Sequence, residues 1–133
     1  MKKVGIIGAG KIGGSLLLRL AESGGFDLGA SDIHPEQLRP YESVGVRTTS
    51  SNRELAEASD LVIAAVKPWD VAQVMEEISP SFEDSDKAVA SVAAGVSIAR
   101  ISESLPQGTA ILRVMPNVCA SVGLGSAVVT ANE

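Results

Sequence analysis

Short apolar runs alternate along this chain with segments in which apolar residues recur at helical spacing. Leu61–Val66 is the clearest apolar run. In Pro68–Ser79, which follows it, the apolar residues fall at i, i+3, i+4 and i+7, as on one face of a helix: Val71, Val74, Met75 and Ile78. This alternation is typical of repeated βα units and predicts an α/β fold with a mostly parallel sheet.

The same pattern predicts where the individual elements lie. Strands are expected at Val4–Gly8, Leu28–Ser31, Val46–Thr49, Leu61–Val66, Ala88–Val92, Ala110–Val114 and Ser126–Thr130. The first helix should bury Ile12, Leu16 and Leu20 and end at Gly24-Gly25. Further helices are expected at Pro35–Val44, from a capping box at Ser51–Glu54 to Ala58, at Pro68–Ser79, and after Ser97 with Ile98, Ile101 and Leu105. These elements fit a Rossmann-like, doubly wound sheet that binds its ligand at the carboxyl ends of the first and fourth strands.

A glycine-rich turn joins the first strand to the first helix. Gly8 allows a tight turn, Gly10 allows the backbone to approach a pyrophosphate, and Gly13 allows close packing of the helix on the sheet. Amide groups at the helix start would face the phosphates. The segment therefore predicts dinucleotide binding, and the alternative is a glycine turn with a purely structural role.

Asp32 lies at the end of the second strand, about twenty residues beyond the glycines. A carboxylate there would accept both ribose hydroxyls of NAD and repel the 2′-phosphate of NADP. Asp32 could instead cap the following helix, and Ser31 or His34 could still hold a phosphate. A general-acid role for His34, on a loop before Pro35, is disfavoured.

Three loops follow the carboxyl ends of strands on the edge that carries the glycine turn. They are Ala64–Pro68, Ala93–Gly95 and Met115–Asn117, and small residues in two of them would let backbone atoms pack against a flat ring. Alternatively, the prolines end strands and the small residues make turns. Lys67 is the only cation beside the expected site, and it is better suited to shaping the loop than to donating a proton. The sequence therefore identifies no catalytic residue.

Composition limits the class of protein. The 133 residues fit one domain, 1–133, with an aliphatic core, because aromatic residues make up only 3%. A formal charge of −5 argues against nucleic acid as a partner. Cys119 is the single cysteine, and no Cys and His residues have metal-ligand spacing. With no apolar run near the ~18 residues of a membrane span, we expect a cytoplasmic protein without a membrane partner or a metal.

Five motifs in order resemble the amino-terminal domain of pyrroline-5-carboxylate reductase, over essentially the whole chain: Ile7–Gly10, Ala65–Pro68, Ala93–Ile98, Arg113–Asn117 and Val122–Gly125. The resemblance implies an oxidoreductase that passes a hydride from NAD(P)H to the C=N bond of 1-pyrroline-5-carboxylate, giving proline. It implies cofactor contacts at Asn52, Ala65, Val66, Lys67, Pro68, Ala94 and Gly95, besides Gly8, Ala9, Gly10, Lys11, Ile12 and Gly13 of the turn. In the family, the loop that matches Asn117 lies beside the nicotinamide and the substrate.

The departures from the family pattern are informative. Asp32-Ile33 stands where NADP-preferring members often have Asn-Arg, which favours NAD. Val118-Cys119 stands where Thr-Pro is common, so a hydroxyl near the reacting centre is missing, and Cys119 is read as a packed or loop thiol.

The largest departure is length, because family members continue into a helical dimerisation domain that supplies much of the substrate pocket. Without that domain an apolar patch near Val128 and Val129 would be uncovered, so we expect a homo-oligomer or a partner there. Two other functions remain open: a dinucleotide-binding regulatory module without turnover, and a different Rossmann dehydrogenase acting on a hydroxy acid or prephenate.

Overall fold

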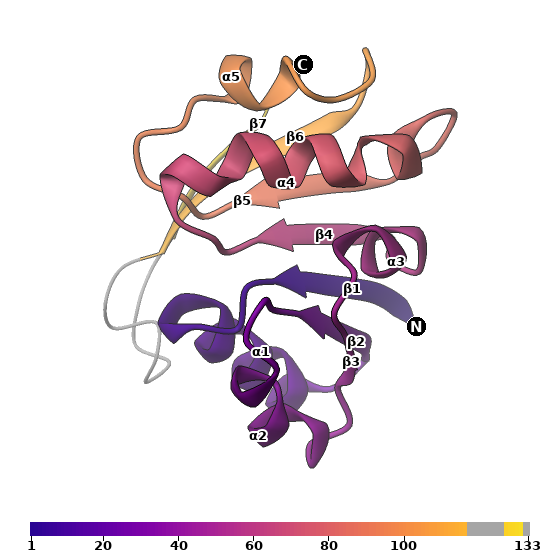
Figure 1. Ribbon diagram of the computed structural model, residues 1–133, viewed down its shortest axis with the longest axis vertical. Coiled ribbons are helices and arrows are strands. Elements are labelled where there is room, and N and C mark those ends of the chain that lie inside the picture. The colour runs from indigo at the N-terminus through magenta and orange to yellow at the C-terminus, as the bar shows by residue number, and fades with distance from the viewer. Residues whose placement is uncertain (117–126, 132–133) are drawn as a thin grey trace.

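A seven-stranded sheet with the strand order β3-β2-β1-β4-β5-β6-β7 forms the centre of the protein (Figure 1). The computed structural model describes residues 1–116 and 127–131. Strands β1 to β6 are parallel, and β7 pairs antiparallel with β6. The strands are β1 (Lys2–Ile7), β2 (Phe26–Ser31), β3 (Arg47–Thr49), β4 (Leu61–Ala64), β5 (Ala88–Ser91), β6 (Ala110–Pro116) and β7 (Ala127–Ala131). The expected Rossmann-like, mostly parallel sheet is confirmed.

Helices cover both faces of this sheet. They are α1 (Lys11–Ser23), α2 (Arg39–Glu42), α3 (Asn52–Glu57), α4 (Val71–Ile78) and α5 (Ile98–Ser102), with single 3₁₀ turns at Pro35–Gln37, Pro68–Asp70 and Ser79–Phe82. Because successive side chains of a strand point to opposite faces, Ile6 of β1 packs in the core beneath α1, whereas Ile7 packs in the core beneath α3, α4 and α5. In Figure 1 the arrowheads of β1, β4 and β5 point to one side, so their carboxyl ends share one edge of the sheet.

Two sequence predictions about helices are wrong in detail. The expected helix Pro35–Val44 is a 3₁₀ turn followed by the short helix α2, because Pro40 has no N–H to continue an α-helical ladder. In α1, Ile12 is 48% exposed, while Leu17 is fully buried. Leu16 and Leu20 of the expected stripe do pack against the core, so the stripe is wrong only at its first position.

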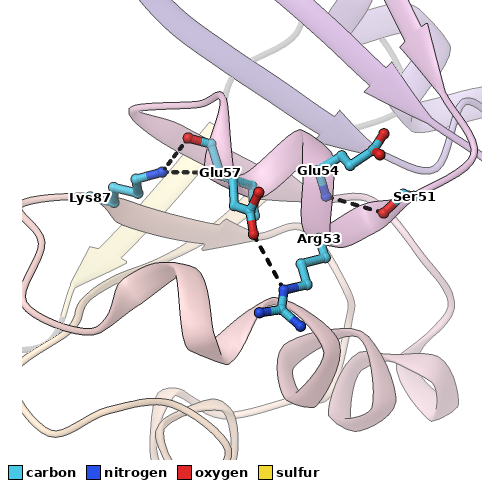
Figure 2. A network of polar contacts seen from close by, with 6 residues as sticks. Ser51, Arg53, Glu54, Glu57 and Lys87 are labelled. Atoms are coloured by element: carbon cyan, nitrogen blue, oxygen red, sulfur yellow. Dashed lines mark hydrogen bonds and ion pairs between the residues drawn. The ribbon is translucent and has the colours of Figure 1, made fainter.

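Helix α3 is held at both ends by polar contacts (Figure 2). At its start, the Ser51 hydroxyl accepts a hydrogen bond from the Glu54 amide at 3.1 Å, as expected for a cap. The reciprocal half of the capping box is absent in this described segment, because the Glu54 carboxylate accepts from the Thr49 hydroxyl. At its end, the Lys87 ammonium donates to the carbonyls of Ala56 and Glu57, at 2.7 and 2.8 Å.

Asp60 precedes β4 and links it to β1 at the amino-terminal ends of the strands, opposite the edge that their carboxyl ends share. Its carboxylate accepts a hydrogen bond from the Lys3 amide at 2.9 Å, and its own amide donates to the Lys3 carbonyl at 2.8 Å. The hydrogen bond from Lys3 and the nearby charges of Lys2, Lys3 and Lys87 hold the pKa of Asp60 below its usual value. Among the helices of the described residues, none has the length and apolarity needed to cross a membrane.

Candidate functional site

The glycine turn is built so that only glycine fits at two of its positions. Gly8 has φ of +96°, and its amide donates to the Ser31 carbonyl at 2.8 Å, which joins the ends of β1 and β2. A side chain on Gly8 would collide with the Ala65 carbonyl oxygen, and one on Gly13 would collide with the Gly8 carbonyl oxygen. The turn therefore brings the start of α1 against the ends of β1 and β4.

Gly10 differs from these two glycines because the space beside it is open. Apart from Gly10 and its two chain neighbours, no heavy atom of the described residues lies within 4 Å of the position that a Cβ atom on Gly10 would occupy. Gly10 is the N-cap residue of α1 and makes no side-chain cap, and its carbonyl accepts from the Gly14 amide at 2.7 Å. The first amides of α1 have no intrahelical partner, and the helix dipole adds partial positive charge there. This corner can accept an anionic group.

Asp32 joins the glycine turn to the loop that follows β2, through its two carboxylate oxygens. One oxygen accepts from the Ala9 amide and the other from the His34 amide, each at 2.7 Å. The alternative that Asp32 caps the next helix is wrong, because His34 is the N-cap residue of the 3₁₀ turn that follows. Each carboxylate oxygen has a second lone pair, so Asp32 can still accept hydrogen bonds from a ligand.

The second wall comes from the segments after β4 and β5. The Ala65 amide donates to the Ile7 carbonyl at 2.8 Å, and the Val92 amide donates to the Ala64 carbonyl at 3.2 Å. The buried Ser91 hydroxyl accepts from the Ala93 amide at 3.2 Å. These bonds hold Ala65, Val92 and Ala93 in place along the edge of the sheet.

The two walls enclose a cleft of about 640 Å³, within the range of small-molecule sites. It lies at the ends of β1 and β4, where the strand order reverses, which is where doubly wound sheets bind ligands. The sequence-predicted residues that line it are Gly8, Gly10, Lys11, Ile12, Asp32, Ala65, Val66, Lys67, Pro68 and Ala94. It is also lined by Ile33, His34 and Ala93, which the sequence analysis placed near the site, and by Asp70 and Val92, which it did not single out.

The remaining predicted site residues lie elsewhere. Ala9 and Gly13 are buried in the turn behind the cleft. Gly95 lines a neighbouring hollow of about 250 Å³ together with Trp69 and Arg100. Asn117, like Val118 and Cys119, lies outside the described residues.

Ser31 and Asn52 contact each other rather than the cleft. Ser31 is fully buried, and its hydroxyl donates to Asn52 Oδ1 at 2.6 Å. Asn52 Nδ2 donates to a carboxylate oxygen of Glu77 on α4 at 3.1 Å. Sequence reasoning missed Glu77, because a single exposed acid on the polar face of a helix carries no local signal of a distant partner.

Charges of both signs surround the cleft. Lys11 and Lys67 contribute ammonium groups, and Asp32 and Asp70 contribute carboxylates. His34 lies at the rim, with Nδ1 at 3.8 Å from a carboxylate oxygen of Glu36. The amides at the start of α1 fit an anionic group at the glycine turn, and along the second wall the opposite charges of Lys67 and Asp70 flank small residues.

Comparison with known proteins identifies relatives of this architecture. Residues 3–95 match the family described as NADP oxidoreductase, coenzyme F420-dependent. Pyrroline-5-carboxylate reductase of Methanosarcina acetivorans is 35% identical over 125 residues, which cover 91% of this chain and 46% of the relative. The match supports the resemblance carried by the motifs.

Solved structures give the same result. A pyrroline-5-carboxylate reductase from Coxiella burnetii superposes with a TM-score of 0.93 at 31% identity, covering 98% of this chain and 49% of the other. The Plasmodium falciparum enzyme, solved with NADP bound, superposes with a TM-score of 0.86 at 27% identity, covering 99% of this chain and 48% of the other.

This chain spans about half the length of the curated relatives it matches. The part that it does match carries the glycine turn, the second wall and every strand of the sheet. The chain thus belongs to the NADP oxidoreductase, coenzyme F420-dependent family, and it corresponds to the amino-terminal dinucleotide-binding domain of pyrroline-5-carboxylate reductases.

Proposed function

We propose that this chain is the cofactor-binding part of an NAD(P)H-dependent reductase that converts 1-pyrroline-5-carboxylate to proline. One observation carries the proposal: a cleft of ligand size lies at the switch point of the sheet, with open space at Gly10 and an uncapped helix start behind it. The NADP-bound relative supports a nicotinamide dinucleotide as the ligand of such a cleft.

In this proposal the amides at the start of α1 hold the diphosphate, and Asp32 accepts the hydroxyls of the adenosine ribose. The Ala65–Pro68 loop and Ala94, with Gly95 next to it, support the nicotinamide from the second wall. The bound cofactor supplies the hydride. The chain's own residues bind and orient it, and positioning of this kind can contribute ~7–11 kcal/mol toward lowering a barrier.

NAD is the proposed preferred form of the cofactor. The Asp32 carboxylate would repel a 2′-phosphate, and the next residue, Ile33, is 86% exposed and offers no positive charge. Lys11 and His34 are the nearby groups that could oppose this preference. The substrate is proposed to be a cyclic imine, bound with the help of a helical domain or of a second copy of the chain.

A titration with NADH and with NADPH tests the proposal. Trp69 is the single tryptophan, is 77% exposed, and follows Pro68 of the cleft, so its fluorescence reports binding there. Saturable quenching by NADH, with weaker quenching by NADPH, is the expected result. An unchanged signal, together with an unchanged thermal midpoint in both cofactors, would refute dinucleotide binding.

An imine-reduction assay on the same sample separates two functions. Oxidation of NADH with 1-pyrroline-5-carboxylate, by this chain alone or after a helical domain from a relative is added, would support the reductase. A regulatory module without turnover is the second candidate. Binding without turnover under both conditions would favour that module.

A further inference from the structure

Three side chains from three separate elements form a chain of hydrogen bonds beside the cleft. Ser31 is the last residue of β2, Asn52 is the first residue of α3, and Glu77 lies on α4. The Ser31 hydroxyl donates to Asn52 Oδ1 at 2.6 Å, and Asn52 Nδ2 donates to Glu77 at 3.1 Å.

This chain of contacts fixes which way the Asn52 amide faces. If the amide were flipped, its oxygen would lie against the Glu77 carboxylate, and two acceptors would repel each other. Glu77 therefore favours the orientation in which Oδ1 faces Ser31. One Nδ2 hydrogen and one lone pair of Oδ1 remain for another partner.

Asn52 lies near the end of the cleft that is proposed to hold the adenosine. Ser31 precedes Asp32, whose carboxylate holds the glycine turn. Asn52 is thus anchored one residue away from the group proposed to accept the ribose hydroxyls. As the first residue of α3, which follows β3, it lies at the carboxyl-end side of the sheet, next to the cleft but not in its lining.

We propose that Glu77 is a positioning residue for the cofactor, which acts by holding the Asn52 amide ready to hydrogen-bond the adenosine ribose. This inference rests on the proposed function, because it needs the dinucleotide in the cleft. Glu77 does not itself touch the cofactor. Its contribution is to present Asn52 in one orientation before the cofactor arrives, which lowers the cost of binding.

Glu76 provides a matched control for Glu77. It is the neighbouring exposed acid on the same helix, with the same charge and the same helix propensity. Glu77→Ala, Glu77→Gln and Glu76→Ala are compared by NADH titration, with Asn52→Ala and the Asn52→Ala/Glu77→Ala double variant completing a cycle.

Glu77→Ala is expected to weaken NADH binding by about three- to tenfold, the value of one modest hydrogen bond. Glu77→Gln should restore most of the affinity, because its amide oxygen can accept from Asn52 Nδ2. Glu76→Ala should bind like the unchanged chain, and the double variant should bind no more weakly than Asn52→Ala alone.

The outcomes separate this inference from the proposed function. If the unchanged chain binds neither NADH nor NADPH, the proposed function fails and this inference fails with it. If the unchanged chain binds but Glu77→Ala binds equally well, only the inference fails. Equal weakening by Glu76→Ala and Glu77→Ala would also overturn it, since the effect would then be one of charge. If Glu77→Ala does not fold, weakened binding by a folded Glu77→Gln variant would overturn the acceptor role.

Discussion

The two walls of the cleft are held in place by different chemistry. On the glycine-turn side a carboxylate takes part: Asp32 accepts from two backbone amides at 2.7 Å. On the other side, the residues after β4 and β5 are held by backbone bonds and by the neutral hydroxyl of Ser91. The first wall is held together by a carboxylate, whereas the second is held by neutral groups and carries small residues, with the charges of Lys67 and Asp70 at its start.

This difference indicates that the two walls suit different parts of a ligand. Fixed dipoles and a carboxylate suit the diphosphate and ribose of a dinucleotide, because those groups are recognised through hydrogen bonds. Small side chains and backbone suit a flat ring, which is recognised by contact area. Substitutions in the first wall should therefore change affinity and the choice of nucleotide.

The largest effect is expected from Gly13→Ala. The new methyl group would collide with the Gly8 carbonyl oxygen and press on the Ala65 side chain, which would separate the two walls. Unfolding in urea should show a loss of about 3 kcal/mol, at the upper end for overpacking. A midpoint equal to that of the unchanged chain would show that the walls are not packed as described.

Gly10→Ala should produce the opposite pattern. Its methyl group would enter open space, and Gly10 has φ of −76°, which alanine tolerates, so stability should stay within about 0.5 kcal/mol. The same methyl group would occupy the path of the diphosphate, and NADH binding should weaken by about tenfold or more. Retained affinity would place the diphosphate elsewhere.

Asp32→Asn tests the charge of the first wall. The asparagine oxygen can keep one of the two amide bonds, but the negative charge is lost. The ratio of NADH to NADPH affinity should fall by about fivefold, because removing a like charge near a phosphate is worth on the order of 1 kcal/mol. Titration of both cofactors gives the ratio, and an unchanged ratio would remove Asp32 from the ribose site.

The smallest effect is expected from Asp60→Asn, at the edge of the sheet away from the cleft. Since folding lowers the pKa of Asp60, its stabilising contribution is present above the unfolded pKa and is lost as pH falls through the folded pKa. Below about pH 4 the variant should lose less stability than the unchanged chain does. Its NADH affinity at neutral pH should be unchanged, and a weakened affinity would contradict the separation of the two edges.

The sequence predicts the sheet and the position of the cleft well, because both depend on local signals. Apolar runs identify the strands, and the glycines after β1 identify the turn. At the first turn of α1 it is Gly13, packed against Gly8, that meets the sheet while Ile12 is exposed, and periodicity alone does not encode that contact.

The polar contacts of the site were harder to predict. The bonds from Asp32 to Ala9 and from Asn52 to Glu77 join residues far apart in the chain, and only the folded sheet brings them together. Ser31 was expected at the cofactor, and the structure buries it beneath Asn52 instead. A serine at the end of β2 has the same residue type and strand position whether it contacts a ligand or is buried against a neighbouring side chain. Only the tertiary contacts distinguish the two arrangements.

The attachment of Lys87 to the end of α3 has a consequence for the order of assembly. A helix as short as α3 does not persist in water by itself, and its closing carbonyls are bound by a residue 30 or 31 positions further along the chain. We expect α3 to become ordered only after β4, α4 and the start of β5 have come together. The start of α3, which carries Asn52, would then be among the last parts of the proposed nucleotide site to fold during synthesis.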